Sequence, residues 1–256
     1  MTSAPRRARS TPSRSKGVPR GLGSLVIAID GPAGSGKSTV ARGVARALGL
    51  RRLDTGAMYR AVTLEALRAG VAPDDGPGLA RVARRIRFSH RDSELSVDGR
   101  RVGASIRRPE VSRVVSVVAA HPALRRELVR KQRELIGRGG VVVEGRDIGT
   151  VVCPDADLKV FLTASPAERA RRRHRELAGA GVRVAYRALK KDLDRRDQLD
   201  SNRQASPLKA AADAVRVDST GKTPRRVVGE IVSLARDRVA AAKPKRKRTG
   251  RARPSA

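Results

Sequence analysis

A glycine-rich run early in the chain has the residue types and spacing of a phosphate-binding loop. It reads Gly31, Pro32, Ala33, Gly34, Ser35, Gly36, Lys37, Ser38, with Thr39 next, and fits the pattern G-x-x-x-x-G-K-[ST]. Glycines let the backbone wrap closely around phosphate oxygens and turn successive N–H groups inward. We expect Lys37 to reach the β- and γ-phosphates and the Ser38 hydroxyl to bind Mg²⁺. The run predicts a nucleoside triphosphate site and leaves the phosphate acceptor open.

The flanking residues supply the elements that this loop needs. Residues 25–30 form a continuous apolar run, which is typical of a strand buried on both faces. After the loop, apolar residues recur with helical spacing until Gly49. A strand, a glycine loop and a helix in this order open a parallel α/β sheet. Further strands are expected at 141–143, 158–162 and 215–217, and further helices at 57–69, 110–120, 122–136, 166–178, 184–197 and 224–240.

Two local features complete the predicted architecture. Short alternating runs at 86–88 and 94–97, with turns after each, predict a small antiparallel β insert at about 85–104. Thr55 stands where it could cap the helix expected at 57–69. The expected fold class is therefore α/β, a three-layer P-loop fold around a central parallel sheet.

Composition sets the limits of the folded part. Residues 1–24 and 241–256 are rich in Arg and Lys and poor in apolar residues, so we expect two disordered basic tails around one domain at 25–240. The formal net charge is +32, and a basic domain suits polyanionic ligands. No apolar stretch is long enough for a membrane span. Cys153 is the only cysteine, which excludes an intrachain disulfide and favours a cytoplasmic location.

Four further blocks resemble the signature blocks of bacterial cytidylate kinases. They are residues 54–60 (DTGAMYR), 106–112 (IRRPEVS, followed by Ser116 and Arg125), 144–150 (EGRDIGT) and 196–203 (RDQLDSNR). The resemblance covers about 25–240 and implies a monomeric nucleoside monophosphate kinase with a helical lid at about 166–182. It also places the β insert in the monophosphate-binding region. The sequence departs from the pattern at Thr55, Glu144, Leu199 and Ser201, and none of these changes removes a required group.

The resemblance assigns three arginines from separate segments to the acceptor phosphate: Arg60, Arg146 and Arg196. Arginine is the preferred side chain for phosphate oxygens because its planar fork matches two of them. In a chain with 57 Lys and Arg residues, a solvated surface position is the alternative for any single arginine. Thr55 and Tyr59 belong to the same implied substrate site.

The base and the ribose have implied partners as well. The resemblance places Ser116, Arg125 and Asp147 at the base, where Asp147 can accept from the exocyclic amine of cytosine and the other two can donate. Ser116 could instead bond to its own helix backbone. Asp200 and Arg203 match positions that contact the ribose.

Arginines crowd the segment expected to form the lid. Arg169, Arg172 and Arg173 follow the strand at 158–162, and positions 169 and 173 share a helical face. We expect Arg169 and Arg173 to cover charge that develops on the transferred phosphoryl group, together with Lys37. A solvated basic face is the alternative. Asp30, just before the loop, could orient Mg²⁺ waters or fix the turn.

The expected reaction is transfer of the γ-phosphate of ATP to CMP or dCMP, with Mg²⁺. One alternative is a P-loop kinase for another nucleoside monophosphate or a small metabolite. Another is a P-loop ATPase that acts on nucleic acid, which the basic tails suggest but the 2% aromatic content disfavours, because bases stack on aromatic rings. We expect no specific nucleic-acid partner and only weak polyanion contact through the tails.

Overall fold

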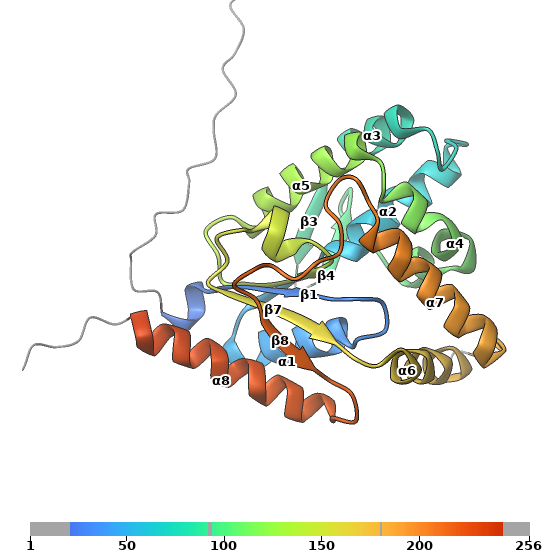
Figure 1. Cartoon of the computed structure of the whole chain (residues 1–256). Helices are drawn as coiled ribbons and strands as arrows, with labels where there is room; N and C mark the ends of the chain where they lie inside the picture. The colour runs from blue at the N-terminus through green and yellow to red at the C-terminus, as the bar shows by residue number, and fades with distance from the viewer. Residues whose placement is uncertain (1–20, 92–93, 180, 243–256) are drawn as a thin grey trace, which may run out of the picture.

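The computed structural model describes residues 21–91, 94–179 and 181–242, and the predicted tails fall almost wholly outside this range. Five strands form a parallel sheet in the order β2 (Arg51–Asp54), β6 (Val141–Gly145), β1 (Val26–Asp30), β7 (Leu158–Thr163) and β8 (Val215–Asp218) (Figure 1). All four strand pairings are parallel, so the carboxyl ends of the strands meet at one edge. The predicted central parallel sheet is confirmed.

Helices cover both faces of this sheet, as the alternating side chains of β1 show. Val26 and Ala28 pack into one core with α2 (Thr55–Arg68), whereas Ile27 and Ile29 pack into a second core with α1 (Lys37–Leu48) and α8 (Pro224–Ala242). In Figure 1 α8 runs along the face of the sheet opposite to α3 and α5. Because both of their faces are buried, the central strands β1 and β6 begin with continuous apolar runs, whereas the edge strands β2 and β8 do not.

The segment between β2 and β6 forms the remaining helices and a second sheet. The small sheet is antiparallel, with β3 (Phe88–Arg91), β4 (Glu94–Val97) and β5 (Arg100–Arg101), which confirms the predicted insert. The helices α4 (Pro109–Val118) and α5 (Pro122–Ile136) follow η2 (Ala104–Arg107). These two helices were also predicted from the sequence.

One helix in this segment was not expected from the sequence. The helix α3 (Gly76–Arg85) begins with two glycines and a proline, which hide its helical pattern. The Asp75 side chain caps it by accepting a hydrogen bond from Gly78 N at 2.8 Å, and Leu79 and Ala83 are buried. A strong cap and a buried stripe therefore outweigh the low helix propensity of glycine.

The start of α2 also differs from the prediction. The helix begins at Thr55, and its cap is the side chain of Asp54, which accepts from Ala57 N at 3.0 Å. The Thr55 hydroxyl instead donates to the Glu144 carbonyl oxygen at 2.7 Å, across the neighbouring strand end. The expectation that Thr55 caps the helix is wrong because this strand end lies within reach of its hydroxyl.

Two helices project beyond the carboxyl edge of the sheet, where the lid was predicted. The helices α6 (Pro166–Gly179) and α7 (Tyr186–Ser201) lie against each other at one side of the molecule (Figure 1). A short helical turn, η3 (Ile148–Val152), follows β6 at the same edge, and η1 (Leu22–Ser24) precedes β1. Within the described residues, no helix is both long and apolar enough to cross a membrane.

Candidate active site

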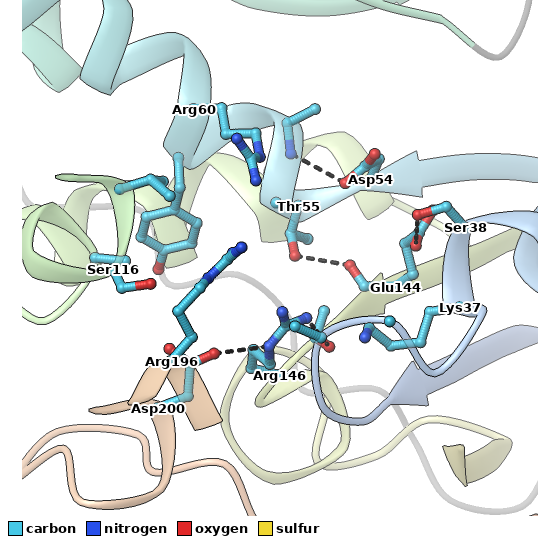
Figure 2. Close-up of a pocket in the computed structure, with 18 of the residues that line it drawn as sticks. Lys37, Ser38, Asp54, Thr55, Arg60, Ser116, Glu144, Arg146, Arg196 and Asp200 are labelled. Carbon is cyan, nitrogen blue, oxygen red and sulfur yellow. Dashed lines mark hydrogen bonds and ion pairs between the residues drawn. The ribbon is translucent and has the colours of Figure 1, made fainter. Parts of the chain in front are cut away.

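A cavity of about 720 Å³ opens at the carboxyl edge of the parallel sheet. Its walls come from the glycine loop, the ends of β2 and β6, the start of α2, and helices α4 to α7. Figure 2 shows side chains from these separate segments facing one space. Of the residues predicted for the triphosphate, six line the cavity: Ala33, Gly34, Gly36, Lys37, Ser38 and Thr39. Gly31, Pro32 and Ser35 do not line the cavity.

The glycine loop has a backbone that only glycine tolerates at its key positions. Gly34 and Gly36 have φ of 75° and 92°, and Gly31 has φ of 151°. A Cβ at Gly31 would lie 2.0 Å from the carbonyl oxygen of Leu162 in β7. The loop is therefore pressed against the neighbouring strand, and α1 starts directly after it at Lys37. Its amides and the helix N-terminus form a receptor for anionic oxygens.

Lys37 is held inside this loop. Its Nζ donates to the Pro32 carbonyl oxygen at 2.6 Å, and its side chain is buried. Burial lowers the Lys37 pKa well below its ordinary 10.5, and the nearby Arg146 lowers it further. A bound phosphate would restore the favourable environment of the ammonium group.

Glu144, at the end of β6, faces the loop serine. Ser38 Oγ donates to Glu144 Oε2 at 2.7 Å, and Arg52 Nη1 donates to Glu144 Oε1 at 2.9 Å. Burial raises the Glu144 pKa to about 7, and the nearby Asp54 carboxylate adds to the rise. A hydroxyl and a carboxylate therefore lie together beside the phosphate loop.

Asp30 fixes a turn, one of the two roles considered for it. Its Oδ1 accepts from Ile148 N and its Oδ2 from Gly149 N, both at 2.8 Å. Both carboxylate oxygens thus bind the start of η3, just after the 144–147 segment. Burial raises the Asp30 pKa to about 6 despite these two hydrogen bonds.

The far side of the cavity gathers arginines. Arg60 from α2, Arg146 after β6 and Arg196 from α7 point toward one space, with Lys37 across from them (Figure 2). Burial, with Arg196 and other arginines nearby, lowers the Arg60 pKa to about 10. Arg196 makes no hydrogen bond or ion pair with any part of the chain that the structure describes, and burial and Arg146 lower its pKa. Like charges at this density form a receptor for an anion.

Arg107 and Arg173 add to this cluster. Both line the cavity, Arg107 from η2 and Arg173 from α6. Each has an acidic neighbour: Arg107 lies 3.8 Å from Asp54, and Arg173 lies 2.8 Å from Glu176. A role for Arg173 was predicted from the sequence, whereas none was predicted for Arg107, although it lies within the 106–112 block.

The deep end of the cavity holds a buried ion pair. Arg125 Nη2 donates to Asp147 Oδ2, and the two side chains are only 4% and 6% exposed. Arg125 also donates to the Ala119 carbonyl oxygen at 2.9 Å and stacks over the Tyr59 ring at 5.4 Å from its centroid. Ser116 lines the same end, and its hydroxyl makes no hydrogen bond to its own helix or to another described residue. Tyr59, Ser116, Arg125 and Asp147 are thus brought together.

Asp200 and Arg203 lie between this end and the arginine cluster. Asp200 Oδ2 accepts from Arg146 Nε at 2.9 Å, and Asp200 Oδ1 accepts from Arg203 Nη2. The two arginines hold the Asp200 pKa below its ordinary 3.8 even though its side chain is buried. The helix α7 therefore contributes Arg196, Asp200 and a following arginine to one wall.

The arginines of the helix α6 lie in different surroundings. Arg173 lines the cavity, but Arg169 does not, because α6 lies so close to the loop that a Cβ on Gly34 would be 3.1 Å from both the Cβ and the carbonyl oxygen of Arg169. The Arg169 side chain is enclosed and donates to the carbonyl oxygens of Ala164 and Ala33 and to Asp197. A shared helical face therefore does not give these two residues the same surroundings, and their expected joint action on the transferred phosphate stays a prediction.

Comparisons with known proteins identify the family. The family model described as cytidylate kinase matches residues 27–237. A cytidylate kinase from Desulfitobacterium hafniense (strain Y51) is 50% identical over 219 residues, which cover 84% of this chain and 94% of that protein. A cytidylate kinase from Mycolicibacterium paratuberculosis (strain ATCC BAA-968 / K-10) is 51% identical over 219 residues, covering 84% and 96%. This chain belongs to the cytidylate kinase family.

The family resemblance drawn from the sequence is thus confirmed, but reasoning from residues missed part of the site. Glu144 was noted only as a departure from the family pattern, although its place at the end of a buried strand signals a group beside the phosphate loop. Asp54 and Arg107 lie inside recognised blocks and also line the cavity. Asp197, next to Arg196, was given no role, and its contacts with the loop appear only in three dimensions.

Proposed function

We propose that this protein transfers the γ-phosphate of ATP to CMP or dCMP, giving ADP and CDP or dCDP. One observation carries this choice of acceptor: the buried Arg125–Asp147 pair beside Ser116 at the deep end of the cavity. Membership of the cytidylate kinase family supports it independently.

The base assignment follows from donors and acceptors. Cytosine presents an amine that donates, and a ring nitrogen and a carbonyl that accept. Asp147 Oδ2 is occupied by Arg125, and no described residue donates to Asp147 Oδ1, which leaves that oxygen for the amine. Arg125 and Ser116 supply the donors. Uracil would place a carbonyl oxygen against the Asp147 carboxylate, leaving two buried acceptors without a proton between them.

The acceptor phosphate belongs, in this proposal, to the arginine cluster of Arg60, Arg146 and Arg196, with Arg107 and Arg173 beside it. Burial, followed by repulsion from neighbouring arginines, lowers the pKa of Arg60 and Arg196, and an anion there would compensate for both effects. Thr55 lies at the start of α2, where its hydroxyl fixes the β6 end next to Arg146. In this proposal, Asp200 and Arg203 contact the ribose.

The chemical step needs no protein nucleophile. A phosphate oxygen of CMP attacks the γ-phosphorus in line, the bond to the bridging oxygen breaks, and ADP leaves with that oxygen. Lys37 and the loop amides hold the donor, and Arg146, Arg173 and Arg196 neutralise charge on the transferred group. In place of Arg169, whose side chain is enclosed, Arg173 is the lid arginine that we assign to this role.

The oxygen donors beside the loop suit Mg²⁺. The Ser38 hydroxyl and the Glu144 carboxylate are hard ligands 2.7 Å apart, and Mg²⁺ commonly uses one or two protein oxygens with phosphates and waters. Bound there, the ion would neutralise charge on the triphosphate. Its arrival would also lower the raised pKa of Glu144.

We place the catalytic domain at 25–240, with α6 and the start of the following segment, about 166–182, acting as the lid and the 85–104 insert belonging to the acceptor side. The protein would work as a monomer in the cytoplasm, and the basic ends of the chain would make only weak, nonspecific contacts with polyanions. The charge of these ends supports that last assignment.

A coupled assay of ADP release tests the proposal, with ATP, Mg²⁺ and CMP, dCMP, UMP, AMP or GMP in turn. Turnover with CMP and dCMP, with UMP at least about 100-fold lower in kcat/KM, is expected from the base-reading groups. Equal turnover with a purine monophosphate would overturn the roles of Ser116, Arg125 and Asp147.

A further inference from the structure

The Asp197 side chain does not line the cavity, but it connects the phosphate loop to the helices α6 and α7. Asp197 of α7 accepts from the Ala33 backbone N–H through Oδ1 at 3.2 Å and from Arg169 through Oδ2. Arg169 in turn donates to the Ala33 carbonyl oxygen at 3.1 Å. Both backbone polar groups of Ala33 are thus bound by one carboxylate and one guanidinium, from two different helices.

Apolar packing around these contacts also brings the loop, α6 and α7 together. Ala33, Ala170 of α6 and Leu193 of α7 form a small buried apolar cluster of their own. The Arg169 and Asp197 side chains are only 7% and 19% exposed. The phosphate loop, α6 and α7 therefore meet at one joint, which contains both an apolar cluster and an ion pair.

The helix that carries Asp197 also carries groups of the acceptor side. Arg196 is the preceding residue and lines the cavity, and Asp200, one turn later, binds Arg146. Any shift of Asp197 relative to Ala33 therefore moves Arg196 and Asp200 relative to the loop that holds Lys37. Within the described residues, the hydrogen bond from Ala33 N to Asp197 links the loop directly to α7, and the Asp197–Arg169 ion pair links α7 to α6.

We propose that Asp197 is a positioning residue that sets the distance between the donor loop and the acceptor arginines, acting through Ala33 and Arg169 without touching either nucleotide. This inference rests on the proposed phosphoryl transfer. In-line transfer requires the reacting atoms to be about 3–3.5 Å apart, and a misplacement of about 1 Å can cost about 100-fold in rate. A joint of this kind acts on kcat more than on binding of either substrate.

The test replaces Asp197 with Asn, which keeps the shape and an oxygen for Ala33 N–H but removes the charge that binds Arg169. We expect kcat with ATP and CMP to fall about 10- to 100-fold, with both KM values within about 3-fold of wild type. Asp194→Asn is the matched control, because Asp194 lies on the same helix and does not line the cavity, and it should keep wild-type kcat.

Melting temperature and nucleotide binding separate positioning from mere stability. A structural role would lower the melting temperature and leave kcat per folded molecule unchanged, which would overturn the proposal, as would wild-type kcat in a fully folded Asp197→Asn protein. A rise in the KM for CMP at unchanged kcat would overturn it as well, since that pattern marks a direct substrate contact.

A second variant covers the case in which Asp197→Asn does not fold. Arg169→Lys keeps the charge but cannot span Ala33, Ala164 and Asp197 at once, so it should reproduce the fall in kcat. An unchanged kcat in that variant would contradict the proposed positioning role of Asp197. If the wild-type protein itself fails to phosphorylate CMP while binding ATP, the proposed function fails, and that result is distinct from the failure of Asp197 alone.

Discussion

The two sides of the cavity are built in opposite ways. On the donor side, Lys37 is already bound to a loop carbonyl oxygen and Ser38 to Glu144, so both side chains have a protein partner. On the acceptor side, Arg196 has no partner in the described chain, and burial and neighbouring arginines lower the pKa of Arg60. The donor side is a preformed cradle, whereas the acceptor side keeps like charges together for an anion to neutralise.

This difference has a physical origin in the chain. The donor cradle comes from one continuous stretch, in which glycine geometry and the start of α1 are fixed locally. The acceptor cluster draws single residues from α2, from the segment after β6, and from α6 and α7, so only the tertiary fold holds its charges in place. Substitutions on the two sides should therefore differ in their effects on rate, specificity and stability.

The largest effect is expected from removing the donor-side cation. Lys37→Ala should lower kcat by about 10³-fold, because no other described group replaces an ammonium inside the loop. Steady-state ADP release with saturating CMP measures it. Lys222→Ala, which removes a lysine from an ion pair with Glu230 away from the cavity, is the control and should keep full turnover. Full turnover in Lys37→Ala would refute the assignment of the donor side.

The next largest effect concerns the base. Asp147→Asn exchanges a buried acceptor for a group that can also donate, so the ratio of kcat/KM for CMP over UMP should fall about 100-fold. The same change breaks a buried ion pair and should cost about 3–5 kcal/mol of stability. Both kinetic constants are measured with each monophosphate. An unchanged CMP preference would remove Asp147 from the base site.

Two smaller effects, one on the KM for CMP and one on stability, are expected from a substitution in the acceptor cluster. Arg196→Gln should raise the KM for CMP about 10-fold, because one charge-assisted contact with the phosphate is lost. Without ligand, the same variant should melt about 2–4 °C higher, since it relieves like-charge repulsion worth about 1 kcal/mol. Kinetics and thermal unfolding in phosphate-free buffer measure the two parts. A lower melting temperature would contradict the account of stored repulsion.

The last expected effect is on the pH dependence of stability and leaves the rate aside. Burial raises the Glu144 pKa from its ordinary 4.5 to about 7, so the folded protein holds this proton more tightly than the unfolded chain. The contribution of Glu144 to the free energy of unfolding therefore falls as the pH rises from about 4.5 to about 7, by at most about 1.4 kcal/mol per pH unit. Urea unfolding of wild type and Glu144→Gln without Mg²⁺ should show the difference, and parallel pH profiles would contradict it.

Sequence reasoning predicted what is encoded locally. The glycine loop, the buried strands predicted at 25–30 and 141–143 and most helices follow from spacing and composition, and the structure confirms them with slightly different bounds. Contacts with distant segments were not predicted from local sequence: Thr55 bonds to Glu144 instead of capping α2, and Arg169 donates to the carbonyl oxygen of Ala33 in the loop. The α3 helix was missed because its glycines oppose a helix that only burial and a cap stabilise.

The measurement that tests the contrast most directly compares CMP with cytidine, each added alone to the wild-type protein during thermal unfolding. Both carry the base that Arg125 and Asp147 would read, but only CMP carries the phosphate for the arginine cluster. Ligands that bind only the folded state stabilise it by about 2.7 kcal/mol at 100 times their Kd. The account predicts that CMP raises the melting temperature by several degrees and that cytidine at the same concentration has little effect. Equal shifts of the melting temperature with both ligands, or no shift with CMP, would contradict the assignment of the arginine cluster to an anion.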